Sequence, residues 1–175
     1  GLRRPDRGDR QIRPLDGAGK AGRGQRGFGE VAGGEVPGTL AGVTSAIGAP
    51  AAAGIPVTHR NVATSFTVVT GHREKGGSTN IEWEALARVG GTIVVLMGVA
   101  ERALIAARLI AGGLSPETPV AAVRWGTRPE QQTTRTTLAE LGTAAVEAPS
   151  TIVIGAVAAF DFSPGAQSAQ ALEVF

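Results

Sequence analysis

Residues 42–71 read GVTSAIGAPAAAGIPVTHRNVATSFTVVTG and contain a helix signal followed by a strand signal. Either Thr44 or Ser45 is a suitable N-cap for a short alanine-rich helix that we expect to run to about Ala53. Ser65–Thr70 is rich in β-branched residues and predicts a strand that ends at a glycine. This pair of elements begins an alternation of helices and strands.

The alternation continues to residue 157. Strands that alternate with helices predict an α/β fold in which helices cover both faces of one sheet. The predicted helices are Ile81–Val89, Glu101–Ala111 and Leu138–Val146; the predicted strands are Thr92–Met97, Pro119–Arg124 and Thr151–Val157, with an extended segment at Gln131–Thr136.

Composition restricts both the core and the possible chemistry. Only 4% of the residues are aromatic, so we expect a core of Val, Ile, Leu and Ala, which suits a buried sheet. The chain has no cysteine and two histidines, which excludes disulfides and predicts no metal site. The uncharged apolar runs Val89–Ala100 and Ala148–Phe160 are shorter than the roughly 20 residues of a membrane-spanning helix. Without a visible signal peptide, the expected location is the cytoplasm.

Residues 1–41 differ in character from the rest of the chain. They hold eleven of the 26 glycines and show neither helical nor strand periodicity, so we expect no fold of their own. Gly17, Gly19 and Gly22 spell a G-x-G-x-x-G motif, but Pro14 precedes it where a dinucleotide loop needs a strand. These residues carry eight Lys/Arg and five Asp/Glu, a net charge of +3, so the remaining residues have a net charge of −1 and no basic nucleic-acid face is expected on them.

Three of the predicted strands end in a glycine-containing turn. These turns are Thr70-Gly71-His72, Met97-Gly98 and Gly126-Thr127. Ligands of open α/β sheets bind outside the carboxyl ends of the strands, and glycine lets a ligand approach the backbone. The repetition predicts a shared cleft, although glycine also simply terminates strands.

Several motifs resemble those of the uroporphyrinogen-III C-methyltransferase family. They are a Gly-Val-Thr-Ser-Ala helix start, a Gly-Ile-Pro-x-Thr-His-Arg loop and a Thr-Gly-His strand end, followed by GTIVVLMG (91–98), TPVAAVRWGT (118–127) and TTLAELG (136–142). The resemblance implies a tetrapyrrole methylase fold with a mixed sheet flanked by helices. It also implies S-adenosylmethionine as the cofactor and methylation of uroporphyrinogen III at ring positions 2 and 7, giving precorrin-2 for sirohaem or cobalamin synthesis.

The resemblance also implies site residues. For the cofactor these are Thr44, Ser45, Met97 and Gly126, and the spacing from Met97 to Gly126 matches the family without a gap. The alternatives are that Met97 fills a gap in the core and that Thr44 is only a helix cap.

The substrate contacts implied by the resemblance are Arg60 and His72. Uroporphyrinogen III carries eight carboxylates, which a guanidinium group binds in paired hydrogen bonds. His72 is suited either to hydrogen-bonding a carboxylate or to moving a proton, whereas His59 is interpreted as structural. The residue that removes the proton is not identified.

The first 41 residues lack the family's N-terminal glycine-rich loops. We therefore expect a displaced reading frame in residues 1–41, a remnant of the first methylase domain in 42–62, the second domain in 63–161 and a tail in 162–175. Such a chain is expected to be weakly active or inactive alone, and the family implies a homodimer if it folds. DNA upstream of Val43 in which no shifted frame encodes Gly-Gly-Asp-Pro would contradict the displaced frame.

Three other functions remain open. The first alternative is another tetrapyrrole methylase of cobalamin synthesis. The second is an inert fragment, and the third is a protein that binds nucleic acid through its Arg/Gly head. The Gly-Ile-Pro-x-Thr-His-Arg loop and the Trp-Gly-Thr-x-x-x-Gln run favour uroporphyrinogen III over later intermediates. The head lacks interleaved aromatic residues, so neither nucleic acid nor a membrane is the expected partner.

Overall fold

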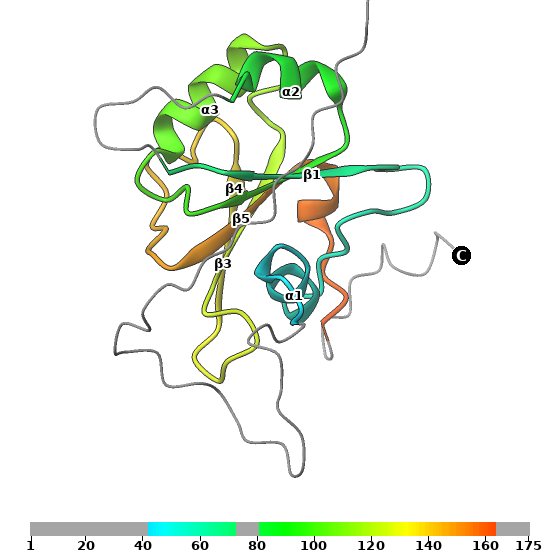
Figure 1. Cartoon of the computed structure of the whole chain (residues 1–175), viewed down its shortest axis with the longest axis vertical. Helices are drawn as coiled ribbons and strands as arrows, with labels where there is room; N and C mark the ends of the chain where they lie inside the picture. Colours follow the sequence, from blue (N-terminus) through cyan, green and yellow to red (C-terminus); the bar gives the residue numbers. More distant parts are fainter. Residues whose placement is uncertain (1–41, 73–80, 164–175) are drawn as a thin grey trace, which may run out of the picture. The chain divides into compact units, whose positions relative to one another are not determined.

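The computed structural model describes residues 42–72 and 81–163, and the predictions for residues 1–41 and 164–175 lie outside that part of the chain. No helix within it is long and apolar enough to cross a membrane. Figure 1 shows the elements in their chain order, which is α1 (Ser45–Ala52), β1 (Phe66–Thr70), α2 (Trp83–Val89), β2 (Thr92–Leu96), α3 (Arg102–Ala111), β3 (Pro119–Arg124), β4 (Gln132–Thr137), β5 (Ser150–Ile154) and the 3-10 helix η1 (Ala156–Ala159).

The strands form one mixed sheet in the order β1-β2-β5-β3-β4. β1 pairs with β2 in parallel, whereas β5 is antiparallel to both of its neighbours, β2 and β3. β2 and β3 therefore run in the same direction as β1. As a result, the carboxyl ends of β1, β2 and β3 and the start of β5 lie at the same edge of the sheet.

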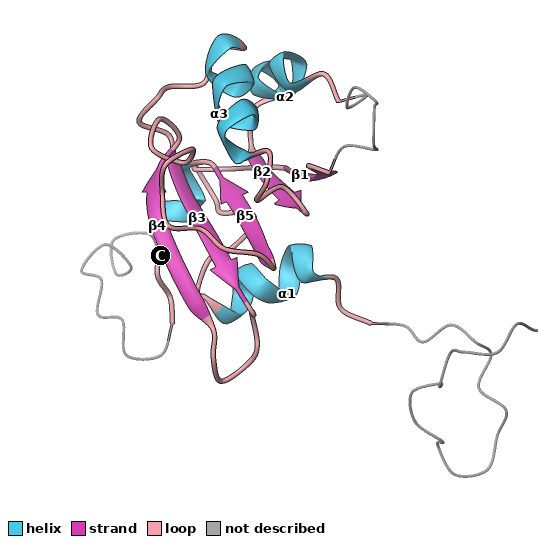
Figure 2. Cartoon of the chain, turned by 90° about the vertical axis from the view of Figure 1, so that its left-hand side faces the viewer, coloured by secondary structure: helices cyan, strands magenta, loops and turns pink. Residues whose placement is uncertain are grey.

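Helices cover both faces of this sheet, as predicted (Figures 1 and 2). On one face, α2 and α3 pack Trp83, Ile105 and Leu109 against the sheet, and each of these side chains is at most 2% exposed. On the other face, Ala49 of α1 and the C-cap residue Ala53 belong to a second buried cluster with side chains of β3, β5 and η1. Burial of this apolar surface stabilises the fold by roughly 25 cal/mol per Å². Side chains from both faces thus fix the positions of the strand ends.

The predicted helix at Leu138–Val146 is wrong. β4 extends to Thr137, and the residues that follow form successive turns. The backbone amides of Leu138 and Ala139 donate to the carbonyls of Thr118 and Pro116, so the chain is held against the turn before β3 and not in a helical register. Leu138 and Leu141 are fully buried, which explains why their spacing resembles that of a helix.

The last strand is shorter than the predicted Thr151–Val157. β5 ends at Ile154, and Gly155 has a φ of 136°, a conformation that L side chains rarely adopt. The chain then turns into η1, whose Val157 is fully buried on the α1 face.

Residues 160–163 pack back onto the fold. The amide of Phe162 donates to the carbonyl of Gly54 at 2.8 Å, and the rings of Phe160 and Phe162 lie 4.9 and 6.1 Å from the ring of His59. These ring contacts support the structural interpretation of His59. The domain boundaries themselves stay predictions.

Asp161 is expected to make stability depend on acidic pH. The hydroxyl and the backbone amide of Ser163 hydrogen-bond to its carboxylate, and with the nearby Arg135 they lower the pKa of Asp161 below its ordinary value. A lowered pKa in the folded state stabilises the fold above the unfolded-state pKa, and this contribution is lost as the pH falls through the folded-state value. Between pH 7 and pH ~2, the free energy of unfolding measured with urea should therefore fall less in Asp161→Asn than in wild type. Equal losses would contradict this role.

Candidate functional site

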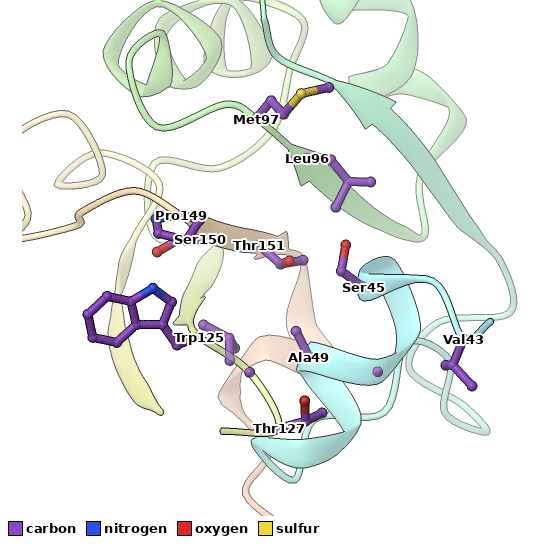
Figure 3. A pocket seen from close by; sticks show the side chains of 13 residues that line it. Val43, Ser45, Ala49, Leu96, Met97, Trp125, Thr127, Pro149, Ser150 and Thr151 are labelled. Carbon is purple, nitrogen blue, oxygen red and sulfur yellow. The ribbon is translucent and has the colours of Figure 1, made fainter. Parts of the chain in front are cut away.

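A cavity of about 760 Å³ opens at the edge where β1, β2 and β3 end (Figure 3). We call it the strand-end cavity. Helix α1 forms one wall, the turn after β3 a second, and the end of β2 with the start of β5 the remainder. Its lining residues are Val43, Ser45, Gly48, Ala49, Leu96, Met97, Val123, Trp125, Gly126, Thr127, Pro149, Ser150 and Thr151.

The structure brings three of the four predicted cofactor residues together. Ser45, Met97 and Gly126 come from α1, the end of β2 and the turn after β3, and all three line the strand-end cavity. Met97 is 66% exposed, so it does not fill a gap in the core. Figure 3 shows Ser45 on the helix wall and Met97 across the cavity from it.

Unusual backbone conformations concentrate around this cavity. In the described part of the chain, four residues other than glycine have positive φ, and three of them, Met97 (53°), Trp125 (48°) and Thr127 (73°), line the cavity. Such conformations are sparsely populated and cluster at functional sites, where the surrounding structure holds them. The backbone geometry thus indicates a binding site without reference to residue type.

Thr44, the fourth predicted cofactor residue, caps helix α1. Its side-chain oxygen accepts a hydrogen bond from the amide of Ala46 at 3.3 Å, and its backbone is extended, with φ −62° and ψ 141°. The cavity lining includes its two neighbours, Val43 and Ser45, but not Thr44 itself. The described contacts therefore place Thr44 as the residue that begins the helix wall.

Replacing this cap should lower stability by about 1 kcal/mol. Thr44→Ala removes the acceptor for the Ala46 amide, whereas Thr44→Ser retains it. Urea denaturation of both variants measures the difference in the free energy of unfolding. Equal loss in the serine and alanine variants would show that the hydroxyl does not act as a cap.

The three strand-end glycines have different surroundings. A Cβ on Gly71 would lie 2.5 Å from the Cα of Gly98, so these two buried glycines allow the turns after β1 and β2 to pack backbone against backbone. Only Gly126 lines the cavity, and a Cβ there would lie 2.5 Å from the Cβ of Ala49. Neighbouring protein atoms fill the space that a Cβ on Gly71 or Gly98 would need, and neither glycine lines the cavity.

The walls of the strand-end cavity are apolar with a few hydroxyl groups. Ser45, Thr127, Ser150 and Thr151 supply these hydroxyls, and no charged side chain is among the lining residues that the structure describes. Arg124 lies behind the wall, where its guanidinium carbon is 4.2 Å from the centre of the Trp125 ring. It also pairs with Glu147 at 2.6 Å. The cavity is thus suited to a largely uncharged ligand surface.

The two predicted substrate residues lie in separate segments, one before and one after β1. Arg60 is exposed in the turn between His59 and Ala63 that precedes the strand, and His72 is exposed just after the strand ends. Neither residue lines the strand-end cavity. The structure therefore does not bring them together with Met97 and Gly126.

Ser150 and Thr151 were missed by sequence reasoning. They begin β5, which pairs between β2 and β3, and this position brings them to the ends of those two strands. Nothing local in the sequence indicates that place in the sheet. Trp125 belongs to the Trp-Gly-Thr-x-x-x-Gln run, but its positive φ and its place in the cavity lining have no sequence signal.

Comparison with known proteins decides the family. The family model described as Tetrapyrrole (Corrin/Porphyrin) Methylases matches residues 37–142, which is more than half of the chain. The chain belongs to this family. The strand-end cavity of this tetrapyrrole methylase chain is built mainly from residues inside the matched range, and only the start of β5 lies beyond it.

Related proteins agree with this assignment. A siroheme synthase from Neisseria meningitidis serogroup C is 51% identical over 118 residues, covering 66% of this chain and 24% of that protein. A uroporphyrinogen-III C-methyltransferase from Synechocystis is 46% identical over 121 residues, covering 66% of this chain and 46% of that protein. This methylase chain thus spans less than half the length of either relative.

A solved structure shows the same fold. The uroporphyrin-III C-methyl transferase from Thermus thermophilus, complexed with S-adenyl homocysteine, superposes with a TM-score of 0.59 and 36% identity. The match covers 67% of this chain and 52% of that one.

Proposed function

We propose that this chain supplies the S-adenosylmethionine site of a uroporphyrinogen-III C-methyltransferase, which methylates ring positions 2 and 7 to give precorrin-2. The observation that supports this most is the meeting of Met97 and Gly126 in one cavity. These residues follow different strands, and the family resemblance assigns both of them to the cofactor. Relatives of this chain carry the names siroheme synthase and uroporphyrinogen-III C-methyltransferase.

The residues of the strand-end cavity fit the uncharged adenosine part of this cofactor. Its volume of about 760 Å³ lies within the range of ordinary small-molecule sites. Leu96, Val123 and Ala49 offer apolar contact, and Ser45 and Thr127 offer hydroxyls beside them. When bound, S-adenosylmethionine supplies an electrophilic sulfonium methyl group.

The chain's own contribution is to position reactants and to exclude water. Met97, Trp125 and Thr127 hold positive-φ backbone conformations beside the cavity, where their backbone groups are placed to position a ligand. The apolar wall around Leu96 and Val123 keeps water from the reacting groups. None of the lining residues that the structure describes is an Asp, Glu, His or Lys, so the proton acceptor is not assigned.

Arg60 and His72 are proposed substrate contacts. Arg60 is exposed and carries a guanidinium group suited to the carboxylates of uroporphyrinogen III. His72 is exposed just after β1 ends, where its imidazole is able to hydrogen-bond a carboxylate. The homodimer stays a prediction, and so does the substrate itself.

Calorimetry with S-adenosylhomocysteine tests the proposed function. We expect binding with a Kd in the micromolar range, or about −8 kcal/mol. ATP is the matched control ligand, because the strand-end cavity offers no charged side chain to its triphosphate within the described residues. Absence of heat with S-adenosylhomocysteine would favour an inert fragment, and equal binding of both ligands would contradict a site for this cofactor.

A further inference from the structure

The side chain of Gln131 joins two walls of the strand-end cavity. Its Oε1 accepts a hydrogen bond from the backbone amide of Thr127 at 2.9 Å. Its Nε2 donates to the carbonyl of Ala52 at 3.1 Å. Thr127 belongs to the turn after β3, whereas Ala52 is the last residue of α1, 79 positions away from Gln131. One amide group thus links two segments that are distant in sequence.

Both ends of this link need a partner. The carbonyl oxygens in the last turn of a helix receive no hydrogen bond from within that helix. The hydrogen bond that Gln131 donates to Ala52 therefore satisfies one of these carbonyls. Thr127 has a φ of 73°, and a residue other than glycine keeps this conformation only where the surrounding structure holds it. The Gln131 side chain therefore stabilises the end of the helix wall and the conformation of the turn together.

The link lies beside a close contact between the two walls. Gly126 packs directly on Ala49 of α1, and both residues line the cavity. Helix α1 and the turn at Trp125–Thr127 make up much of its lining. A change in their separation changes the width of the cavity.

We propose that Gln131 is a positioning residue, whose amide holds the turn at Trp125–Thr127 against the end of α1 and so sets the width of the strand-end cavity. The consequence for ligand binding rests on the proposed function of that cavity. Gln131 itself does not line the cavity, so it acts through the walls and not by touching the ligand.

Two variants separate the two halves of the link. Gln131→Met has a similar length and loses both hydrogen bonds. Gln131→Glu keeps an acceptor for the Thr127 amide but has no donor for the Ala52 carbonyl. Gln132→Met is the matched control, because Gln132 is an exposed neighbour on β4.

Three measurements on the full chain report the result. The rate of hydrogen exchange at the Thr127 amide reports whether its hydrogen bond to Gln131 is formed. Acrylamide quenching reports mainly Trp125, which is 36% exposed, whereas Trp83, the other tryptophan, is 1% exposed. Calorimetry with S-adenosylhomocysteine measures the Kd of the ligand for the strand-end cavity.

In Gln131→Met we expect faster exchange at Thr127, stronger quenching and roughly tenfold weaker binding, as for the loss of one or two hydrogen bonds. In Gln131→Glu we expect Thr127 to stay protected while binding weakens about as much, because the link to α1 is lost. The Gln132→Met control should match wild type in all three measurements.

The outcomes distinguish this proposal from the proposed function. If wild type binds S-adenosylhomocysteine and both Gln131 variants bind it with the same Kd, the positioning role would be overturned. If wild type does not bind S-adenosylhomocysteine, the proposed function fails, and exchange and quenching still decide whether Gln131 holds the turn. Unchanged exchange and quenching in Gln131→Met would then overturn the positioning role as well.

Discussion

Replacing Gly126 with alanine is expected to weaken S-adenosylhomocysteine binding at least about tenfold and to lower the free energy of unfolding by roughly 1–3 kcal/mol. A Cβ at this position would lie 2.5 Å from the Cβ and 2.7 Å from the Cα of Ala49. Ala49 has no flexible side chain that can move aside, so the turn after β3 must separate from α1. Both elements line the strand-end cavity, and its shape changes with their separation.

Gly42→Ala is the matched control for this substitution. A Cβ on Gly42 would meet no atom within 4 Å, and its φ is not in the region that requires glycine. We expect the control to bind and unfold like wild type. Calorimetry and urea denaturation measure both variants, and binding by Gly126→Ala that equals the control would contradict the close contact between the walls.

Trp83→Ala should cost roughly 3–5 kcal/mol of stability, the largest loss expected from any single substitution discussed. Trp83 begins α2, is 1% exposed and belongs to the core cluster between α2, α3 and the sheet. Its removal leaves a cavity that the surrounding side chains fill only in part. The urea midpoint should fall with little change in the slope of the transition.

Val89→Ala provides the comparison on the same helix. Val89 ends α2 and is 68% exposed, so its truncation removes little buried surface. Its free energy of unfolding should stay within about 0.5 kcal/mol of wild type. Similar losses in the two variants would mean that α2 does not pack on the sheet as described.

Local sequence signals predicted most of the individual elements. The strand at Pro119–Arg124 has the predicted bounds, and α1 begins at Ser45 after Thr44, one of the two predicted caps. These elements have strong local signals, namely a continuous apolar run and an N-cap. The predicted helix at Leu138–Val146 failed because burial of Leu138 and Leu141 also occurs in successive turns, which produce the same spacing.

The order of the strands was not predictable from these signals. A short apolar run such as β5 fits either a parallel or an antiparallel position, and only its long-range pairing places it between β2 and β3. This pairing brings Ser150 and Thr151 to the cavity. Met97 and Gly126 were predicted because they follow strands and because the family resemblance assigned them roles.

The link through Gln131 was also beyond sequence reasoning. The Trp-Gly-Thr-x-x-x-Gln run was visible, but its partner, the Ala52 carbonyl, is a backbone group without a sequence signature. Long-range contacts of this kind appear only when the fold brings the end of α1 beside the turn after β3.

A crystal structure of the chain grown with saturating S-adenosylhomocysteine tests the central claim most directly. We predict that the ligand lies in the strand-end cavity, in contact with Met97 and Gly126 and next to Ser45 of α1. A ligand bound elsewhere on the chain, or a cavity that stays empty at saturating concentration, would contradict the proposed cofactor site.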